Sequence, residues 1–397
     1  MARWLTHDVL LISLSAFFAD AGYQALIAGF PIFLVIYLKQ PVYLLGIAMG
    51  LAYGGGSLFA FVGGYIADRW GKKRTAITGN LLIPILSLTG LVTIPAEAIG
   101  LFSGGWWARN FRSPARRAMM GDISASLDRS KVYGFLNALD VSGGIIAVIY
   151  LSIGIYLGIA IGTIFLITII PILVSSVCLL LVKYKGMPNV DNKPVSPKED
   201  YGQRDKVSKT YRAVLLATAI YGISFYSLSF PVLTIAQEST DLYGILSYAL
   251  FLVISAIFGY VAGIFVKKKI TGLAFFGYML AGIGSALIGL SYYYSLGFAF
   301  SYLGVAVVGI AVGSIETLEP TIISLSGGVS SSGRRMGSLT ASRSIGLFLA
   351  NIILGFLYFY NAAYAYTFAA VAAITASLVL IAAGIRSPLN DAAPPDM

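Results

Sequence analysis

Long apolar segments recur along almost the whole chain, and they constrain its fold more than any other feature. Each of these runs is about 18 to 25 residues long, enough for an α-helix to cross a hydrocarbon layer roughly 30 Å thick. The sequence is 58% apolar and only 11% charged, whereas soluble domains carry about 25% charged residues. The sequence therefore predicts an all-α integral membrane protein.

Twelve transmembrane helices are predicted, with boundaries that can move by about two to four residues. They are expected over residues 9–38, 43–67, 75–94, 96–118, 132–157, 158–182, 213–236, 242–266, 271–292, 296–325, 337–360 and 362–385. A polar stretch rich in proline and charge occupies 184–211 and reads as a solvated cytoplasmic linker. Two domains follow, an N-terminal six-helix bundle over 1–183 and a C-terminal six-helix bundle over 212–397.

Lysine and arginine gather at the termini and in every second loop, which gives the chain an orientation. The basic positions are Arg3, 69–74, 116–131, 183–212, 267–269, Arg334, Arg335 and Arg386. By the positive-inside rule, both termini and the even-numbered loops are cytoplasmic in a multi-pass protein of the plasma membrane. The net charge of +10 is thus assigned to topology rather than to nucleic-acid binding.

The two halves of the sequence resemble each other at three places in the same order. Gly64–Arg74 aligns without a gap to Gly259–Lys269, through a shared Gly-Tyr-aliphatic-Ala start and a basic triplet. Phe30-Pro31 matches Phe230-Pro231, and the frame Gly134–Ala138 matches Gly337–Ala341. Parallel six-helix repeats are a transporter architecture in which the substrate site lies between the halves near mid-membrane.

Residues that support other chemistry are scarce. Cys178 and His7 are single residues of their types, so no zinc, haem or other metal site and no cofactor is expected. The run Gly54–Gly56 lies inside a span and lacks the Lys-Ser/Thr of a phosphate loop, so it is interpreted as helix packing. No nucleophile–base arrangement is visible, and the protein is not expected to be an enzyme.

The segment Gly64–Arg74 carries a family resemblance. Gly64, Asp68, Arg69, Gly71, Lys72 and Lys73 match, position by position, the signature between the second and third helices of the major facilitator superfamily (MFS). The segment from Arg109 to Asp122 also resembles the end of the fourth helix in many prokaryotic members, although Asn110 and Arg117 depart from that pattern. The resemblance implies a secondary transporter with the MFS fold, working by alternating access.

The signature residues are interpreted as a cytoplasmic gate. In the resembling family the acid, here Asp68, docks against the opposing bundle when the cytoplasmic side is closed. Asp122 and the arginines near it are the expected partners of the basic cluster. The second-half copy of the signature has Gly263 in place of the acid.

Charged side chains inside the predicted spans need a reason, because each costs about 2.5 kcal/mol or more at mid-helix. They are candidates for binding substrate or protons, or for static ion pairs such as Arg109–Asp140 and Glu316–Arg343. A rise of about 1.5 Å per residue places five of these charged residues at a similar depth, in one polar layer: Asp20, Arg109, Asp140, Glu316 and Arg343. The cavity candidates are Asp20, Gln24, Arg109, Arg112, Asp140 and Arg343.

Proton coupling has two candidate sites. Asp20 has no basic neighbour in its own helix, and desolvation favours the protonated form of a carboxylate in an apolar cavity. Glu316 and Glu319 lie one turn apart on one helix face, beside Pro320, which is expected to bend that helix.

The predicted function is movement of a small solute across the membrane, coupled to protons, by a chain that acts as a monomer. Three alternatives stay open. Efflux of drug-like or toxic compounds is favoured, transport of an anionic nutrient would use Arg109 and Arg112 as an anion clamp, and a non-transporting receptor or assembly factor could use the same scaffold.

Overall fold

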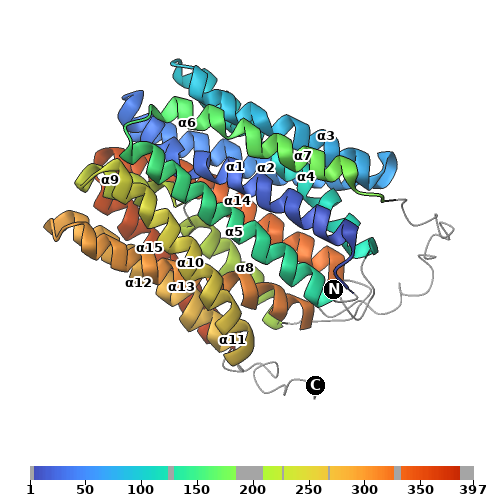
Figure 1. Ribbon diagram of the computed structural model, residues 1–397. Coiled ribbons are helices and arrows are strands. Elements are labelled where there is room, and N and C mark those ends of the chain that lie inside the picture. Colours follow the sequence, from blue (N-terminus) through green and yellow to red (C-terminus); the bar gives the residue numbers. More distant parts are fainter. Residues whose placement is uncertain are drawn as a thin grey trace.

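Every regular element of the computed structural model is helical within the residues that it describes, 4–123, 129–184, 209–225, 228–266, 269–325 and 332–384. The helices run lengthwise through one bundle, and their ends collect at two opposite sides (Figure 1). One side holds the start of α1 (His7–Ile32) and the end of α15 (Ala362–Gly384). We call it the terminus side and the other the opposite side.

Six spans form the N-terminal half. The first ends in a π-helical turn, η1, the third continues as a 3₁₀ helix, η2, and the sixth is interrupted at Thr168. In chain order the elements are α1, η1 (Phe33–Tyr37), α2 (Val42–Trp70), α3 (Lys72–Leu82), η2 (Ile83–Leu91), α4 (Pro95–Ile123), α5 (Arg129–Tyr156), α6 (Ile161–Ile167) and α7 (Ile169–Leu181).

Six further spans form the C-terminal half, and two of them are composite. The seventh span consists of two helices, and the ninth contains a π-helical segment, η4. In chain order the elements are α8 (Lys209–Ser224), α9 (Ser229–Glu238), α10 (Asp241–Phe265), α11 (Lys269–Gly272), η4 (Leu273–Met279), α12 (Leu280–Tyr294), α13 (Phe298–Leu325), α14 (Ser332–Tyr360) and α15.

Each predicted span coincides with a helix or a set of consecutive helices, so the all-α membrane fold is confirmed. By length and apolarity, ten helical segments of the described chain could cross a membrane. The remaining two spans are the third, which changes winding after Leu82, and α4, which carries Arg109, Arg112, Arg116 and Arg117. The irregular winding of the third span and the charge of α4 explain why a criterion based on helix length and hydropathy does not select them.

Some sequence predictions fall outside the described residues. The linker predicted over 184–211 lies there except for its two ends. Lys267, Lys268 and Arg386 of the predicted basic loops also lie there, as do the side chains of Arg334 and Arg335.

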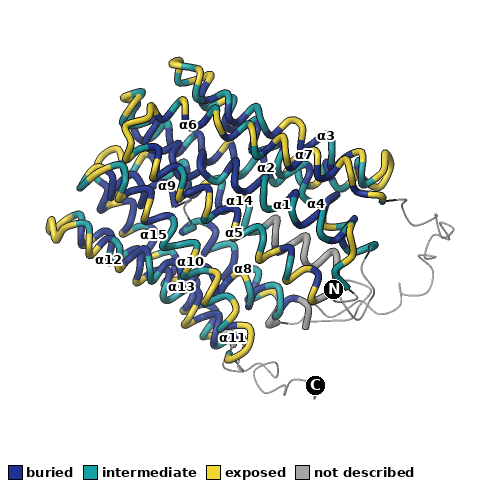
Figure 2. The backbone as a smooth tube through the Cα atoms, in the orientation of Figure 1, coloured by how far each residue is buried: buried dark blue, intermediate teal, exposed yellow. Residues whose placement is uncertain are grey.

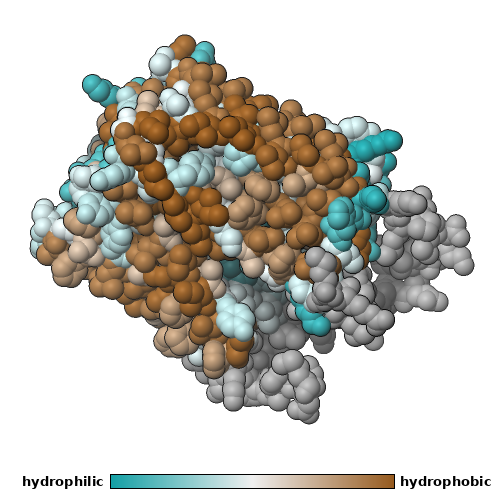
Figure 3. All heavy atoms as spheres, viewed as in Figure 1, coloured by the Kyte–Doolittle hydropathy of each residue, from teal (hydrophilic) through white to brown (hydrophobic). Residues whose placement is uncertain are grey.

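The outer surface of the helical bundle is apolar along its flank. In the view of Figure 3, hydrophobic side chains cover the middle of the molecule and hydrophilic ones collect toward its two ends. Buried residues occupy the interior of the bundle, whereas exposed ones lie along the outer helix faces and at the ends (Figure 2). Such a distribution suits a protein whose flank faces lipid.

The two halves pack against each other through three pairs of helices. Helix α2 packs against α14, α5 against α10, and α1 against α9. At Gly46, near the start of α2, an added Cβ would lie 2.4 Å from the carbonyl oxygen of Asn351 in α14. Hydrogen bonds join the halves from Ser57 to Ser344 (2.6 Å) and from Tyr248 to Gln24 (2.7 Å). Close backbone packing at the start of α2 and hydrogen bonds further along the helices therefore hold the two halves together.

The glycine run inside α2 is used for packing, as predicted. An added Cβ at Gly54 would lie 2.6 Å from Phe348, and one at Gly55 would lie 2.4 Å from Nε1 of Trp107. At Gly56 the nearest atom, Nδ2 of Asn110, would be 2.7 Å away. These glycines allow α4 and α14 to approach α2.

Two adjacent glycines of α2 give a matched test of this packing. A Cβ at Gly63 would lie 2.1 Å from the carbonyl oxygen of Phe111, whereas one at Gly64 would meet nothing closer than Pro114 at 3.8 Å. Gly63→Ala is expected to destabilise the protein by about 1 to 3 kcal/mol because it overpacks the α2–α4 contact. Gly64→Ala is expected to be neutral or stabilising, because alanine is the better helix former. Equal apparent melting temperatures of the two variants in detergent would contradict this close contact.

Candidate functional site

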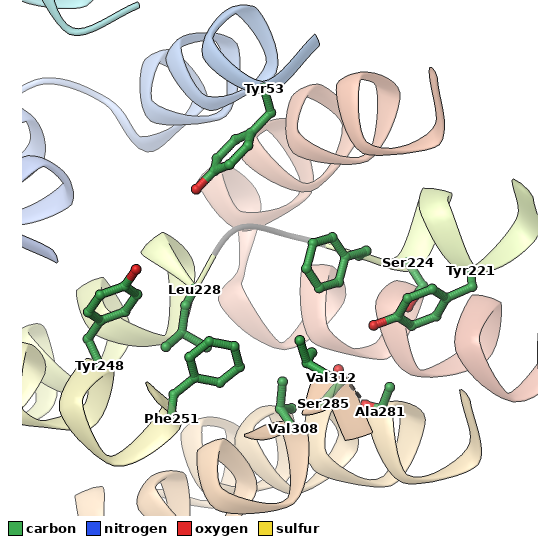
Figure 4. A pocket seen from close by; sticks show the side chains of 11 residues that line it. Tyr53, Tyr221, Ser224, Leu228, Tyr248, Phe251, Ala281, Ser285, Val308 and Val312 are labelled. Carbon is green, nitrogen blue, oxygen red and sulfur yellow. Dashed lines mark hydrogen bonds between the residues drawn. The ribbon is translucent and has the colours of Figure 1, made fainter. Parts of the chain in front are cut away.

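An aromatic cavity of about 120 Å³ lies between the two halves (Figure 4). Tyr53 enters it from α2 of the N-terminal half, and its other walls come from the C-terminal half. The lining residues are Tyr53, Tyr221, Ser224, Phe225, Leu228, Tyr248, Phe251, Ala281, Ser285, Val308 and Val312. An apolar pocket with a few polar groups is the usual form of a small-molecule site.

The break in the seventh span opens onto this cavity. Helix α8 ends at Ser224 and α9 begins at Ser229, and Phe225 and Leu228 between them line the cavity wall. Irregular backbone at membrane depth is tolerated where it borders a cavity. Discontinuous helices form the substrate sites of many transporters.

An ion pair within the N-terminal half joins α4 to α5. Nη2 of Arg116 lies 3.2 Å from Oδ1 of Asp140, and the Arg116 side chain is 2% exposed. From the sequence, a static ion pair between Arg109 and Asp140 is one of the alternatives. In the structure Asp140 pairs instead with Arg116, seven residues further along α4. Seven residues are two helical turns, so both arginines lie on one face of α4 and differ in depth.

Arg112 is fully buried one turn from Arg116. Its Nη1 donates to Oδ1 of Asn80 at 2.6 Å, and Asn80 in turn donates to Ser176 at 2.7 Å. Its Nε and Nη2 atoms have no hydrogen-bond partner among the described residues. Arg112 is therefore held inside the N-terminal half, away from the aromatic cavity, and does not form a clamp with Arg109.

Arg109 is the arginine of this face that reaches toward the cavity. It is partly exposed, its Nε donates to the hydroxyl of Tyr23 at 3.3 Å, and its guanidinium lies 4.9 Å from the ring centre of Trp106. Trp106 packs in turn against Tyr53, which lines the cavity, with their ring centres 5.2 Å apart. Stacking on aromatic rings fixes the guanidinium without neutralising it.

Asp20 lies buried in α1 among these charges. It is 5% exposed, and it makes no hydrogen bond or ion pair with the part of the chain that is described. Arg109, Arg112, Arg116 and Asp140 all act on it electrostatically. Asp20 is thus a buried acid that lies among charged side chains of α4 and α5 without pairing with any of them.

The C-terminal half holds a second cluster, with Arg343 of α14 between two glutamates of α13. Arg343 pairs with Glu316 and with Glu319, and Glu319 is fully buried. The hydroxyl of Tyr278, in η4, donates to Glu319 at 2.7 Å. The predicted Glu316–Arg343 pair is present, and Arg343 balances the repulsion expected between the two glutamates. Helix α13 continues through Pro320.

A family model matches this sequence. The model of the Major Facilitator Superfamily covers residues 12–327 of the chain. The chain belongs to the Major Facilitator Superfamily. No curated protein matches the sequence.

Solved MFS-type transporter structures share the fold. A POT family transporter, solved in complex with a thioalcohol-conjugated peptide, has a TM-score of 0.77 at 13% identity, over 94% of this chain and 95% of that one. A D-xylose–proton symporter has a TM-score of 0.76 at 15% identity, over 95% and 97% of the two chains. The nucleoside transporter NupG, solved in a mutant form, has a TM-score of 0.73 at 12% identity, over 95% and 99%. The protein is a membrane transporter of the MFS and not an enzyme, as predicted.

The MFS signature residues lie together at the terminus-side ends of α2 and α3. Gly71 has a φ of +101°, which favours glycine, and it turns the chain from α2 into α3. Lys72 pairs with Asp122 of α4 at 2.7 Å, and Lys73 donates to the carbonyl of Val182 at 2.7 Å. These bonds join elements of the N-terminal half to one another.

Asp68 and Arg69 do not contact the described residues of the C-terminal half in this structure. Asp68 is exposed, and Arg69 lies over the ring of Tyr65 at 4.4 Å. Tyr184, just after the sixth span, donates to Asp122, and its partial burial together with this bond raises the pKa of Tyr184. The gate therefore stays a prediction for a state in which the terminus side is closed.

Several residues of the site were missed from the sequence. Tyr53, Tyr221 and Tyr248 line the cavity, and Tyr278 holds Glu319, but the chain has 25 tyrosines and periodicity does not distinguish these. The second, eighth and ninth spans, which carry none of the predicted cavity residues, contribute Tyr53, Tyr248 and Ser285. Gln24 was predicted at the cavity, and its amide oxygen accepts from Tyr248.

Proposed function

We propose that this protein is a proton-coupled transporter that moves small aromatic or drug-like organic anions across the plasma membrane by alternating access. In this proposal the terminus side faces the cytoplasm, the chain acts as a monomer, and the solute is exported. The direction rests on the resemblance to prokaryotic members that include exporters. The orientation rests on the distribution of lysine and arginine.

The observation that carries the proposal is Arg109 beside the aromatic cavity. The guanidinium interacts with aromatic rings and a hydroxyl, and no carboxylate lies within ion-pair distance of it among the described residues. Tyr53, Phe225 and Phe251 supply aromatic surface for the body of a solute. A carboxylate or phosphonate on that body would meet Arg109 in a charge-assisted contact.

Proton coupling is assigned to Asp20. Glu319 and Asp140 each have an arginine partner, whereas Asp20 has none within the described chain. For a buried carboxyl group without a partner, the neutral form costs less free energy than the ionised form. Movement of the nearby arginines as the halves rock would change that balance and release or load the proton.

Arg109→Gln is expected to weaken binding of aromatic carboxylates by about tenfold to a hundredfold, because a charged hydrogen bond is worth about 1.5–3 kcal/mol. Binding is measured as ligand-induced thermal stabilisation of the purified protein, with benzoates, naphthoates, lipophilic cations and sugars as ligands. Lys39→Gln, which removes an exposed cation from a loop on the opposite side, is the matched control. A cation that stabilises the wild type more than any anion does would reject the proposal.

A further inference from the structure

In the N-terminal half, the cluster of Asp20, Arg109, Arg112, Arg116 and Asp140 has one more cation than anions, and Arg109 is its member nearest the cavity. Arg109, Arg112 and Arg116 carry three positive charges, and Asp20 and Asp140 carry two negative ones when ionised. Arg116 forms an ion pair with Asp140. Arg112 is fully buried away from the cavity. The uncompensated positive charge therefore resides at Arg109.

In the C-terminal half, the cluster of Arg343, Glu316 and Glu319 has one more carboxylate than cations. Arg343 stands against two glutamates, and Glu319 is fully buried, with the hydroxyl of Tyr278 as a further donor. The side chain of Glu316 is 56% exposed, against 22% for Arg343. With both glutamates ionised the cluster has one more negative charge than positive, and Glu316, although paired with Arg343, is the carboxylate that solvent or a solute can reach.

The Glu316 site adjoins the same aromatic cavity. A narrow recess beside Glu316 and Arg343 is lined by Tyr221, Phe225 and Val312, and these three residues also line the cavity. Val312 lies one turn before Glu316 on α13. The cavity thus has a cation, Arg109, behind Trp106 and Tyr53 on its N-terminal side, and a cluster with a surplus negative charge behind its C-terminal wall.

We infer that the transported solute is dipolar: an aromatic or apolar body with an anionic group that binds Arg109 and a cationic group that binds Glu316. This inference rests on the proposed function and narrows its substrate class from organic anions to amphoteric ones. Tyr221 and Phe225 separate the recess from the cavity at the break of the seventh span. Their movement would bring an ammonium group on the solute to the Glu316 carboxylate.

Arg117 offers another role for Glu316. It lies in α4 of the N-terminal half, is exposed, and is within electrostatic range of Glu316. A closing ion pair between Arg117 and Glu316 would need both residues for every solute. If Glu316 instead binds an ammonium group of the solute, Glu316 is needed without Arg117, and it is needed only for solutes that carry a cationic group.

Three probes with one benzene ring separate these roles. 4-(Aminomethyl)benzoate carries opposite charges at opposite ends of the ring, 4-methylbenzoate lacks the ammonium, and 4-methylbenzylamine lacks the carboxylate. The dissociation constants of all three are measured by isothermal titration calorimetry on the wild type, Glu316→Gln, Arg117→Gln and Arg109→Gln. The glutamine at 316 keeps an oxygen that can accept from Arg343, so the fold is preserved.

The wild type is expected to bind the dipolar probe at least about tenfold more tightly than 4-methylbenzoate. Glu316→Gln is expected to abolish this preference and to leave 4-methylbenzoate binding unchanged, and Arg117→Gln is expected to preserve the preference. Arg109-dependent benzoate binding with no preference for the dipolar probe overturns the inference and leaves the proposed function standing. Equal losses for every probe in Glu316→Gln and Arg117→Gln overturn it in favour of a closing pair. No binding of any probe overturns the inference, and the wider panel of anions and cations then decides the proposed function separately.

Discussion

Asp20→Asn is expected to abolish accumulation of solute against its gradient while leaving exchange of solute across the membrane intact. The asparagine has nearly the shape of the protonated aspartic acid, so the buried site in α1 keeps its packing. Asparagine has no ionisable proton, so the variant can neither load nor release a proton as the charges around this position in α1 move. A coupled transporter that cannot change protonation state can still equilibrate its solute but cannot use a proton gradient to concentrate it.

The measurement uses purified protein in liposomes with an imposed pH gradient, and a solute identified by thermal stabilisation. Wild-type accumulation should disappear when a protonophore removes the gradient, and the Asp20→Asn variant should give the same low level with or without it. Counterflow of labelled against unlabelled solute, which needs no proton movement, should persist in the variant. Glu97→Gln, which neutralises an exposed carboxylate at the start of α4, is the control. Gradient-driven accumulation that survives in Asp20→Asn would remove Asp20 from the coupling mechanism.

The sequence was sufficient to predict the spans, because bilayer thickness sets the length of each apolar run independently of its neighbours. The first span was expected over 9–38 and occupies 7–37, and the eighth was expected over 242–266 and occupies 241–265. The break in the seventh span was not predicted. Residues 213–236 contain one proline, Pro231, and it lies inside α9 rather than at the break.

The charged residues of the site were recognisable from the sequence, but their partners were only partly so. Charge inside an apolar run is a local signal, whereas pairing depends on the rotation and depth of two helices packed together. Arg109 and Arg116 differ by two turns, about 10 Å along the axis, and a boundary error of a few residues is enough to exchange them as partners of Asp140. Glu316 and Glu319 avoided this ambiguity, because α14 has one arginine among its described side chains, Arg343.

Arg343→Met is expected to destabilise the protein by about 3–5 kcal/mol, because removing one partner of a buried pair leaves the other charge without compensation. Glu319 is fully buried, and after the substitution its remaining donors among the described residues would be neutral, the hydroxyls of Tyr278 at 2.7 Å and Thr218 at 3.4 Å. Glu319→Gln is expected to cost less, since Arg343 would still pair with the partly exposed Glu316. The asymmetry between the two variants follows from the difference in exposure between the two glutamates.

The double variant Arg343→Met/Glu319→Gln tests the origin of this cost. It leaves no buried charge in the pair, so it should regain much of the stability lost in Arg343→Met, and the interaction energy from the double-mutant cycle should be about 1 kcal/mol or more. Apparent melting temperatures are compared in one detergent at one scan rate, because membrane proteins commonly unfold irreversibly. If the double variant melts no higher than Arg343→Met, the loss comes from packing of the arginine side chain rather than from the uncompensated carboxylate. Glu319 would then already be neutral in the folded protein, and the surplus anion that the C-terminal half presents at Glu316 would be balanced by Arg343 itself.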